Sequence, residues 1–179
     1  MNAIRMSRDT LLPALAAHVL QSGLGGLSLR PLAKSAGTSD RMLLYHFRSK
    51  EQLVTALLDY LAVQFTLALD SQFPAERSSS RRACAKAVFD ITGQADFAPF
   101  LRVWWDIVAG CAKGEAAYLD AAGKIVDQLL DWVVDHLPAD DPDPSEGARA
   151  VLTIIEGAQM LRAVGRDALG QAGLSALEG

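Results

Sequence analysis

The residues from Gly37 to Leu53, GTSDRMLLYHFRSKEQL, place one histidine between two aromatic residues and a lysine three residues after the second aromatic. An imidazole in such a stretch can act as a general base, hold a metal ion or contact another molecule. Catalysis would need an orienting carboxylate and a nucleophile near His46, and the local sequence supplies neither at a recognisable spacing. A metal site would need partners, yet His18 and His136 lie outside any His/Cys cluster. We therefore predict no catalytic residue, no metal and no cofactor, and interpret the stretch as a helix face directed at another molecule.

The two cysteines and the apolar residues limit the class of protein further. Cys84 and Cys111 lie far apart without a second metal-ligand cluster, so we expect small buried thiols. The apolar residues come in short groups interrupted by charges, and no stretch approaches the roughly 18 to 20 apolar residues of a membrane helix. The first ten residues contain no apolar signal core. These features predict a cytoplasmic protein that is not inserted in a membrane.

The net charge of −4 is unevenly distributed along the 179 residues. Residues 1–50 contain 7 basic and 2 acidic residues, a balance of +5, and the remaining 10 basic and 19 acidic residues give −9. A basic head on an acidic body predicts that the N-terminal end meets a polyanion. An evenly solvated surface is the alternative that charge alone leaves open.

Helix formers dominate the chain, and β-branched residues never settle into a two-residue alternation, which predicts an all-α fold of about nine helices. The first helix begins at Ser7 or, because Pro13 would then lie beyond the first turn, at Thr10. Asp143 followed by Pro144 predicts the start of a late long helix. The expected helices span about 7–22, 28–36, 39–47, 50–73, 79–93, 97–112, 115–137, 143–165 and a short tail segment.

Two short helices joined by the turn AGTS, with a helix before them to pack against, predict a helix-turn-helix. Leu43 and Phe47, four residues apart, would point into its core. Arg41 suits a bidentate pair with guanine, apolar side chains suit thymine methyls, and Lys50 suits a phosphate. The predicted DNA contacts are Ser28, Arg30, Thr38, Ser39, Asp40, Arg41, Met42, Leu44, Tyr45, His46 and Lys50. A three-helix core without a role in DNA binding is the structural alternative.

Residues 7–58 resemble the TetR family of bacterial transcriptional regulators. The matching features are Ser28 opening the second helix, Ala33 through Gly37 with Ser39 at the turn, an aromatic-rich third helix, and Phe47 followed by Lys-Glu-x-Leu at residues 50–53. Three positions depart from the usual pattern: Leu44 stands where the family commonly has its tyrosine, Met42 replaces a small residue, and Pro13 is unexpected in the first helix. The first two departures suggest an unusual base preference.

The resemblance implies a homodimer of helical subunits, each with a DNA-binding domain (1–50) and a domain for ligand binding and dimerisation (51–179). It also implies a repressor that binds a palindromic site in double-stranded DNA and is released by a small molecule. The alternative from another class is a helical ligand-binding or protein-interaction module whose helix-turn-helix no longer reads DNA. The Met42 and Leu44 departures favour that alternative, and the +5 head opposes it.

The rest of the chain offers candidates for the effector site and for the dimer interface. Aromatic pockets between helices commonly take apolar or aromatic ligands, although an aromatic stripe is more often ordinary core. Adjacent Trp104 and Trp105 are about 100° apart on a helix and cannot face the same way. The candidate ligand-binding residues are Leu61, Phe65, Phe100, Trp104, Trp105, Val108, Tyr118 and Met160. The candidate interface residues are Ile154, Gly157, Ala158 and Leu161, packed in a four-helix bundle with the partner.

Overall fold

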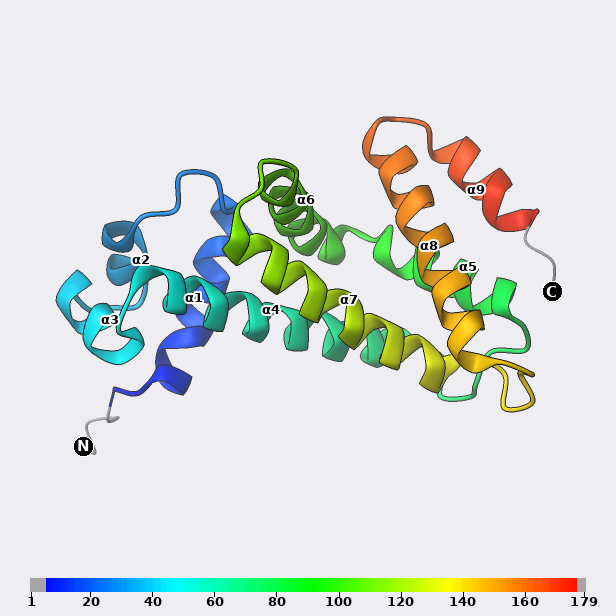
Figure 1. Ribbon diagram of the computed structural model, residues 1–179, viewed down its shortest axis with the longest axis horizontal. Coiled ribbons are helices and arrows are strands. Elements are labelled where there is room, and N and C mark those ends of the chain that lie inside the picture. Colours follow the sequence, from blue (N-terminus) through cyan, green and yellow to red (C-terminus); the bar gives the residue numbers. More distant parts are fainter. Residues whose placement is uncertain (1–5, 177–179) are drawn as a thin grey trace. The chain divides into compact units, whose positions relative to one another are not determined.

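The computed structural model describes residues 6–176, and within that range the chain forms nine α-helices, one short 3₁₀ helix and no strand (Figure 1). The predicted all-α fold is confirmed. The helices are α1 (Arg8–Ser22), α2 (Leu29–Ser35), α3 (Asp40–Phe47), α4 (Lys50–Gln72), α5 (Arg81–Thr92), η1 (Ala95–Phe97), α6 (Ala98–Ala112), α7 (Ala116–His136), α8 (Pro144–Ala163) and α9 (Asp167–Ser175).

Local capping sets most of these boundaries. Ser7 is the N-cap of α1, and it exchanges hydrogen bonds with Thr10 in a capping box, so α1 takes the earlier of the two predicted starts and contains Pro13. Asp143 accepts the N–H of Glu146 at the start of α8, as predicted. Gly23 ends α1 with a φ of 77°.

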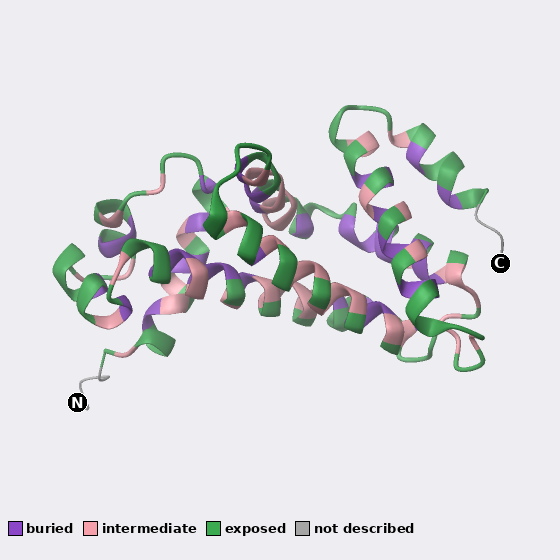
Figure 2. Cartoon of the chain, in the orientation of Figure 1, coloured by how far each residue is buried: buried purple, intermediate pink, exposed green. Residues whose placement is uncertain are grey.

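The helices pack as two units, each of which has its own buried side chains (Figure 2). The first unit contains residues 6–65 and 99–125, and the second contains residues 66–98 and 126–176. Helices α4 and α7 contribute residues to both units. The domain boundary that the sequence predicts at residue 50 remains a prediction. The two packing units divide the chain at other positions, after residues 65, 98 and 125.

The core of the first unit joins the helix-turn-helix to α4, α6 and α7. Leu15, Leu32, Leu43, Phe47 and Leu57 are fully buried together, and residues of α6 and α7 belong to the same cluster. Burying each such side chain contributes about 1.5–3 kcal/mol, so the head is held by packing onto the helices that follow it. The sequence prediction that Leu43 and Phe47 point inward is confirmed.

Helix α6 is also tied to the end of α1 by two side chains that lie one turn apart. Arg102 donates to the carbonyl of Leu20 at 2.5 Å, and the Asp106 carboxylate accepts the N–H of Leu24 at 2.7 Å. Both groups meet backbone atoms that the end of a helix leaves without helical partners. These bonds fix the position of the turn between α1 and α2 against α6.

The second unit is built on α5, α8 and α9, with buried polar groups that are satisfied within it. Gln159 donates to Thr92 between α8 and α5. The Arg162 guanidinium lies 3.4 Å from the centre of the Phe89 ring and donates to Asp167 at 2.8 Å. These contacts hold α8 against both of its neighbours.

Helix α4 is long and apolar enough to cross a membrane by length and composition, which corrects the expectation that no stretch of the chain comes near that limit. Length and composition alone are weak evidence for a membrane span, because the core helix of a soluble protein can have the same length and composition. Leu53, Leu57 and Leu58 of α4 are buried in the core of the first unit. Packing thus accounts for part of the apolar composition of α4, whereas Val63 and Leu67 are exposed.

Arg48, which follows α3, has a φ of 67° and a ψ of −44°, a backbone conformation that residues other than glycine rarely adopt. We expect Arg48→Gly to raise the free energy of unfolding by about 1 kcal/mol, because glycine removes this strain. Arg48→Ala is the control, since it removes the same charge but keeps the Cβ. Urea unfolding checks the prediction, and equal stability of the two variants would contradict it.

Candidate nucleic-acid interface

The turn between α2 and α3 positions the candidate recognition helix. Gly37 has a φ of 62°, and the N–H of Thr38 returns to the carbonyl of Ala33 at 2.9 Å, which reverses the chain in a few residues. The Ser39 hydroxyl then accepts the N–H of Met42 at 3.3 Å and starts α3. At the start of α2, by contrast, the Ser28 side chain makes no capping hydrogen bond, so its exposed hydroxyl is available to an outside partner.

The two faces of α3 differ as the sequence predicts. Leu43 and Phe47 face the core, while Asp40 and Arg41 are exposed. The side chain of Tyr45 is 76% exposed, and those of Met42 and Leu44 are each 37% exposed. A helix of this kind presents cationic, aromatic and apolar groups together, which are the types that read base edges in a major groove.

His46 is the least accessible of the predicted contacts on α3. It is half-buried, its ring lies 5.2 Å from that of Tyr45 in an edge-on arrangement, and its Nε2 atom is buried. Among the described residues, Nε2 has no hydrogen-bond partner. The predicted donation from His46 to a phosphate therefore remains a prediction, and Tyr45 is the more accessible of the two rings.

The start of α4 combines a cation with a carboxylate. Lys50 is exposed at the first residue, and the Ser49 hydroxyl accepts the N–H of Gln52 at 3.1 Å. The pKa of Glu51 is lowered because its carboxylate accepts its own backbone N–H and is also hydrogen-bonded to Ser49 and close to the Lys50 charge. Glu51 is therefore ionised at neutral pH and offsets part of the positive end of α4, so a phosphate there would depend on the Lys50 ammonium itself.

The remaining predicted contacts, Arg30 and Thr38, lie on the same helix-turn-helix, exposed and half-buried respectively. Two further cations, Lys34 and Arg48, are also exposed on this segment but were absent from the predicted set. Both charges are counted in the +5 balance of residues 1–50, but the helix-turn-helix motif gave no reason to predict either residue as a DNA contact. They extend the positive surface beyond α3 itself.

Most of the candidate ligand-binding residues belong to the first unit. Leu61 is buried in its core, Phe65 and Phe100 meet edge-on at 5.7 Å between ring centres, and Trp104 packs against the same core. Trp105 is half-buried, and Val108 is exposed. Met160 lies in the second unit and is 51% exposed. That these residues hold a ligand remains a prediction.

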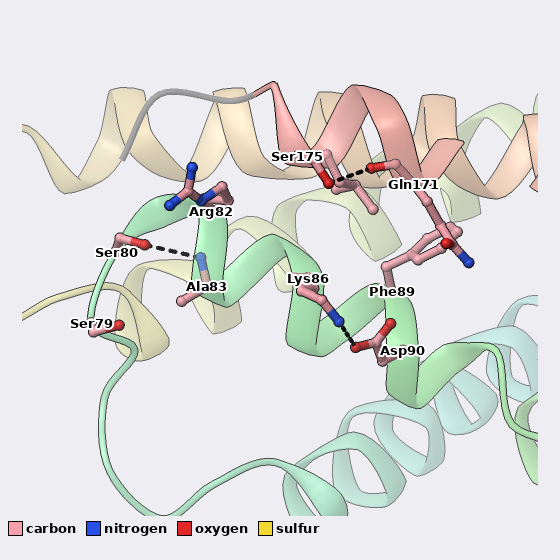
Figure 3. A pocket seen from close by; sticks show the side chains of 10 residues that line it. Ser79, Ser80, Arg82, Ala83, Lys86, Phe89, Asp90, Gln171 and Ser175 are labelled. Atoms are coloured by element: carbon pink, nitrogen blue, oxygen red, sulfur yellow. Dashed lines mark hydrogen bonds and ion pairs between the residues drawn. The ribbon is translucent and has the colours of Figure 1, made fainter. Parts of the chain in front are cut away.

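Two cavities have clearly different linings. The cavity in the second unit, about 610 Å³ in volume, lies between α5 and α9 (Figure 3). Among its polar groups, Lys86 contacts Asp90 at 2.5 Å, and the Ser80 hydroxyl accepts the N–H of Ala83 at the start of α5. The other cavity, about 550 Å³, lies in the first unit and includes Tyr118, one of the candidate ligand-binding residues.

The candidate interface residues on α8 are not equivalent. Gly157 is exposed, with open space where a Cβ would be, whereas Ile154 and Leu161 are half-buried. Ala158 packs within its own chain: a Cβ on Gly170 of α9 would lie 3.3 Å from the Ala158 Cβ. Ala158 is therefore covered by α9 and is unavailable to a partner subunit. Periodicity alone did not show which side of α8 the following helix would cover.

Cys84 is buried and Cys111 half-buried, and both are free thiols. Burial raises the pKa of the Cys84 thiol to about 11, so it remains protonated and unreactive at neutral pH. Within residues 6–176, no group of three His, Cys, Asp or Glu side chains could hold a metal ion. The described residues thus offer no geometry for a metal centre.

Comparisons with known proteins agree with this architecture. Residues 13–57 match the family model described as bacterial regulatory proteins, tetR family. One similar solved structure is assigned to the TetR-family transcriptional regulators and comes from Rhodococcus sp., with 21% identity, coverage of 94% of this chain and 95% of that chain, and a TM-score of 0.72. Another is the TetR-family transcriptional regulator from Cytophaga hutchinsonii, with 19% identity, 95% and 90% coverage and a TM-score of 0.69.

The multidrug binding protein EbrR, solved with imidazole, is similar at 17% identity, with 94% and 87% coverage and a TM-score of 0.67. A comparison with curated proteins gives no significant match. The structural similarities extend over nearly the whole chain, whereas the family model covers the helix-turn-helix and the start of α4.

Proposed function

We propose that the chain is a member of the TetR family of bacterial transcriptional regulators, and that it acts in the cytoplasm as a ligand-responsive repressor that binds a palindromic operator as a dimer. The observation that carries this proposal is the two-faced helix α3. Its Leu43 and Phe47 are buried, and its Arg41 and Tyr45 face outward from a segment of net charge +5. Such a helix is held rigidly while it presents its polar groups to a groove.

Four exposed side chains of α3 have a defined role in the proposed complex. Arg41 pairs with O6 and N7 of a guanine, and Met42 and Leu44 contact thymine methyl groups. Tyr45 donates to a phosphate oxygen, and Lys50 binds a second phosphate at the start of α4. Because Leu44 and Met42 replace the usual residue types, the base preference is expected to differ from that of typical family members.

Dimerisation follows from the geometry of a palindromic site. Two recognition helices must enter successive major grooves roughly 34 Å apart, so the two heads must be held at a fixed spacing. We propose that the partner packs on the exposed face of α8 formed by Thr153, Gly157, Met160 and Val164, which are spaced four, three and four residues apart. This surface retains Gly157 from the predicted interface and excludes the covered Ala158.

Gly157→Arg is expected to convert the dimer to monomers, because a charged side chain would be buried without a partner where α8 now has open space. Size-exclusion chromatography with light scattering measures the change. Gly25→Arg is the matched control, since a Cβ at Gly25 also meets no atom within 4 Å but lies in the turn before α2. A dimer that persists in Gly157→Arg would place the interface elsewhere.

The proposed effector is a small apolar or aromatic molecule that binds among the candidate aromatic residues of the first unit. The contact between Phe65 of α4 and Phe100 of α6 supports this, because a ligand inserted beside these rings would move α4 relative to α6. The similar protein solved with imidazole is described as multidrug binding. Release of DNA requires only that the ligand prefer a spacing of the heads that no longer fits both half-sites.

Selection of binding sequences from random duplex DNA tests the proposed function. We expect the enriched sequences to share a palindrome whose half-sites are one helical turn apart. If no sequence is enriched, the chain has the fold but does not recognise a specific DNA sequence. The alternative, a helical ligand-binding or protein-interaction module, then replaces the proposal.

A further inference from the structure

The cavity of about 550 Å³ in the first unit lies beside the helix-turn-helix. Its walls come from the turn between α1 and α2, the start of α4, the end of α6 and the start of α7. Cavities of this size commonly hold small ligands. The turn that forms one wall is fixed by the bond between Leu24 and Asp106, so this wall is already in place without a ligand.

The charges around this cavity are balanced but unpaired. Its lining includes Lys50, Lys113, Asp106 and Glu115, which are two positive and two negative groups. Within residues 6–176, none of these four side chains forms an ion pair with another. In the α5–α9 cavity, by contrast, Lys86 and Asp90 neutralise each other directly (Figure 3). Opposite charges that share a cavity without touching leave room for a molecule that pairs with both.

The charged groups of the cavity come from three parts of the chain. Tyr118, Glu115 and Asp106 line the same cavity. Burial raises the pKa of Tyr118, and the nearby charges of Glu115 and Asp106 raise it further. Lys50 lies on α4, and Lys113 follows the end of α6. A ligand that carries both a positive and a negative group would match this lining.

We propose that this cavity is a binding site for a small zwitterion that carries an ammonium group, a carboxylate and an apolar side chain. Its ammonium group pairs with Glu115 and the free oxygen of Asp106, and its carboxylate pairs with Lys50 and Lys113. Leu24 and Val54, which are buried at the cavity wall, accept the apolar side chain. Free amino acids such as L-leucine have this chemistry.

A ligand in this cavity is expected to weaken DNA binding. This expectation rests on the proposed function. Lys50 is both a wall of this cavity and the proposed phosphate contact at the start of α4. A carboxylate that pairs with Lys50 competes with the phosphate for the same ammonium group. L-leucine is therefore expected to weaken binding to the selected DNA site, and this effect disappears in the Glu115→Ala variant.

Isothermal titration calorimetry without DNA tests the site independently of the proposed function. The probes are L-leucine, L-phenylalanine and L-methionine, together with two half-ligands of leucine: isoamylamine, which lacks the carboxylate, and 4-methylpentanoate, which lacks the amine. We expect at least one amino acid to bind, and its half-ligands to bind at least about tenfold more weakly because each loses one charged pair.

Variants locate the binding. Lys113→Ala and Glu115→Ala, which change exposed side chains, are each expected to weaken amino-acid binding at least about tenfold. Lys124→Ala on α7 is the control, because Lys124 is exposed, pairs with Asp120 and lies outside the cavity lining. Its affinity should equal that of the unmodified protein.

Three results would overturn the proposal: no binding of any of the three amino acids up to about 10 mM, a half-ligand that binds as tightly as its amino acid, or unchanged affinity in both cavity variants. Each of these results leaves the proposed operator binding standing if the DNA selection succeeds. Conversely, amino-acid binding without operator recognition would support the site and reject the proposed function.

Discussion

Lys50→Ala is expected to weaken binding to every DNA sequence, selected or random, because the Lys50 ammonium contacts a phosphate and carries no sequence information. Loss of one phosphate contact lowers the slope of log K against log salt by about 0.9. Glu51 strengthens this expectation, since its ionised carboxylate offsets the helix end and leaves Lys50 as the local source of positive charge. Fluorescence anisotropy over a series of salt concentrations measures the slope.

Arg41→Ala in the same experiment should behave differently. Its loss removes a bidentate base contact worth about 1–3 kcal/mol and relaxes the preference at one position of each half-site. Lys124→Ala serves as the control for a general loss of positive charge, because Lys124 lies on α7, outside the helix-turn-helix, and pairs with Asp120. If Lys50→Ala and Arg41→Ala alter the sequence preference in the same way, the assignment of one residue to phosphate and the other to a base is wrong.

Gly23→Ala is expected to destabilise the first unit strongly. Gly23 has a φ of 77° and a ψ of −176°, a region that is essentially restricted to glycine and costs other residues about 1–3 kcal/mol. In addition, a Cβ there would lie 2.9 Å from Oδ2 of Asp106, the oxygen that accepts the N–H of Leu24. The substitution therefore strains the backbone and disturbs the bond between α1 and α6 at once.

Urea unfolding followed by circular dichroism measures this loss. Gly25→Ala is the matched control, because it changes a glycine two residues away whose φ is not positive and whose Cβ would meet no atom within 4 Å. Adding Asp106→Ala to Gly23→Ala removes the clash but leaves the backbone strain, so the double variant separates the two causes. Equal stability of Gly23→Ala and Gly25→Ala would contradict the account of this turn.

The sequence predicts the helices well because their ends are fixed by neighbours in the chain. Ser7, Ser39 and Asp143 each cap a helix through a residue three positions later, so the signal and its effect lie within one turn. The inward direction of Leu43 and Phe47 was predictable for the same reason, since a spacing of four places both on one helix face.

Features that depend on distant residues were not predictable in this way. No local pattern in the sequence indicates that Asp106 accepts the N–H of Leu24, 82 positions away. Ala158 lies under α9 because Gly170 lets the two helices approach closely, and the sequence does not specify that pairing. His46 shows the same limit, since its half-burial depends on the packing of the whole head.

The central claim is that α3 reads DNA sequence, and the ratio of affinities for the selected site and a scrambled duplex of equal length tests it most directly. Both affinities should be measured at the same salt concentration, because phosphate contacts alone bind any duplex. We expect a ratio of about 10³ or more, the range of specific DNA-binding proteins. A ratio near one, for a protein that remains folded and dimeric, would contradict it.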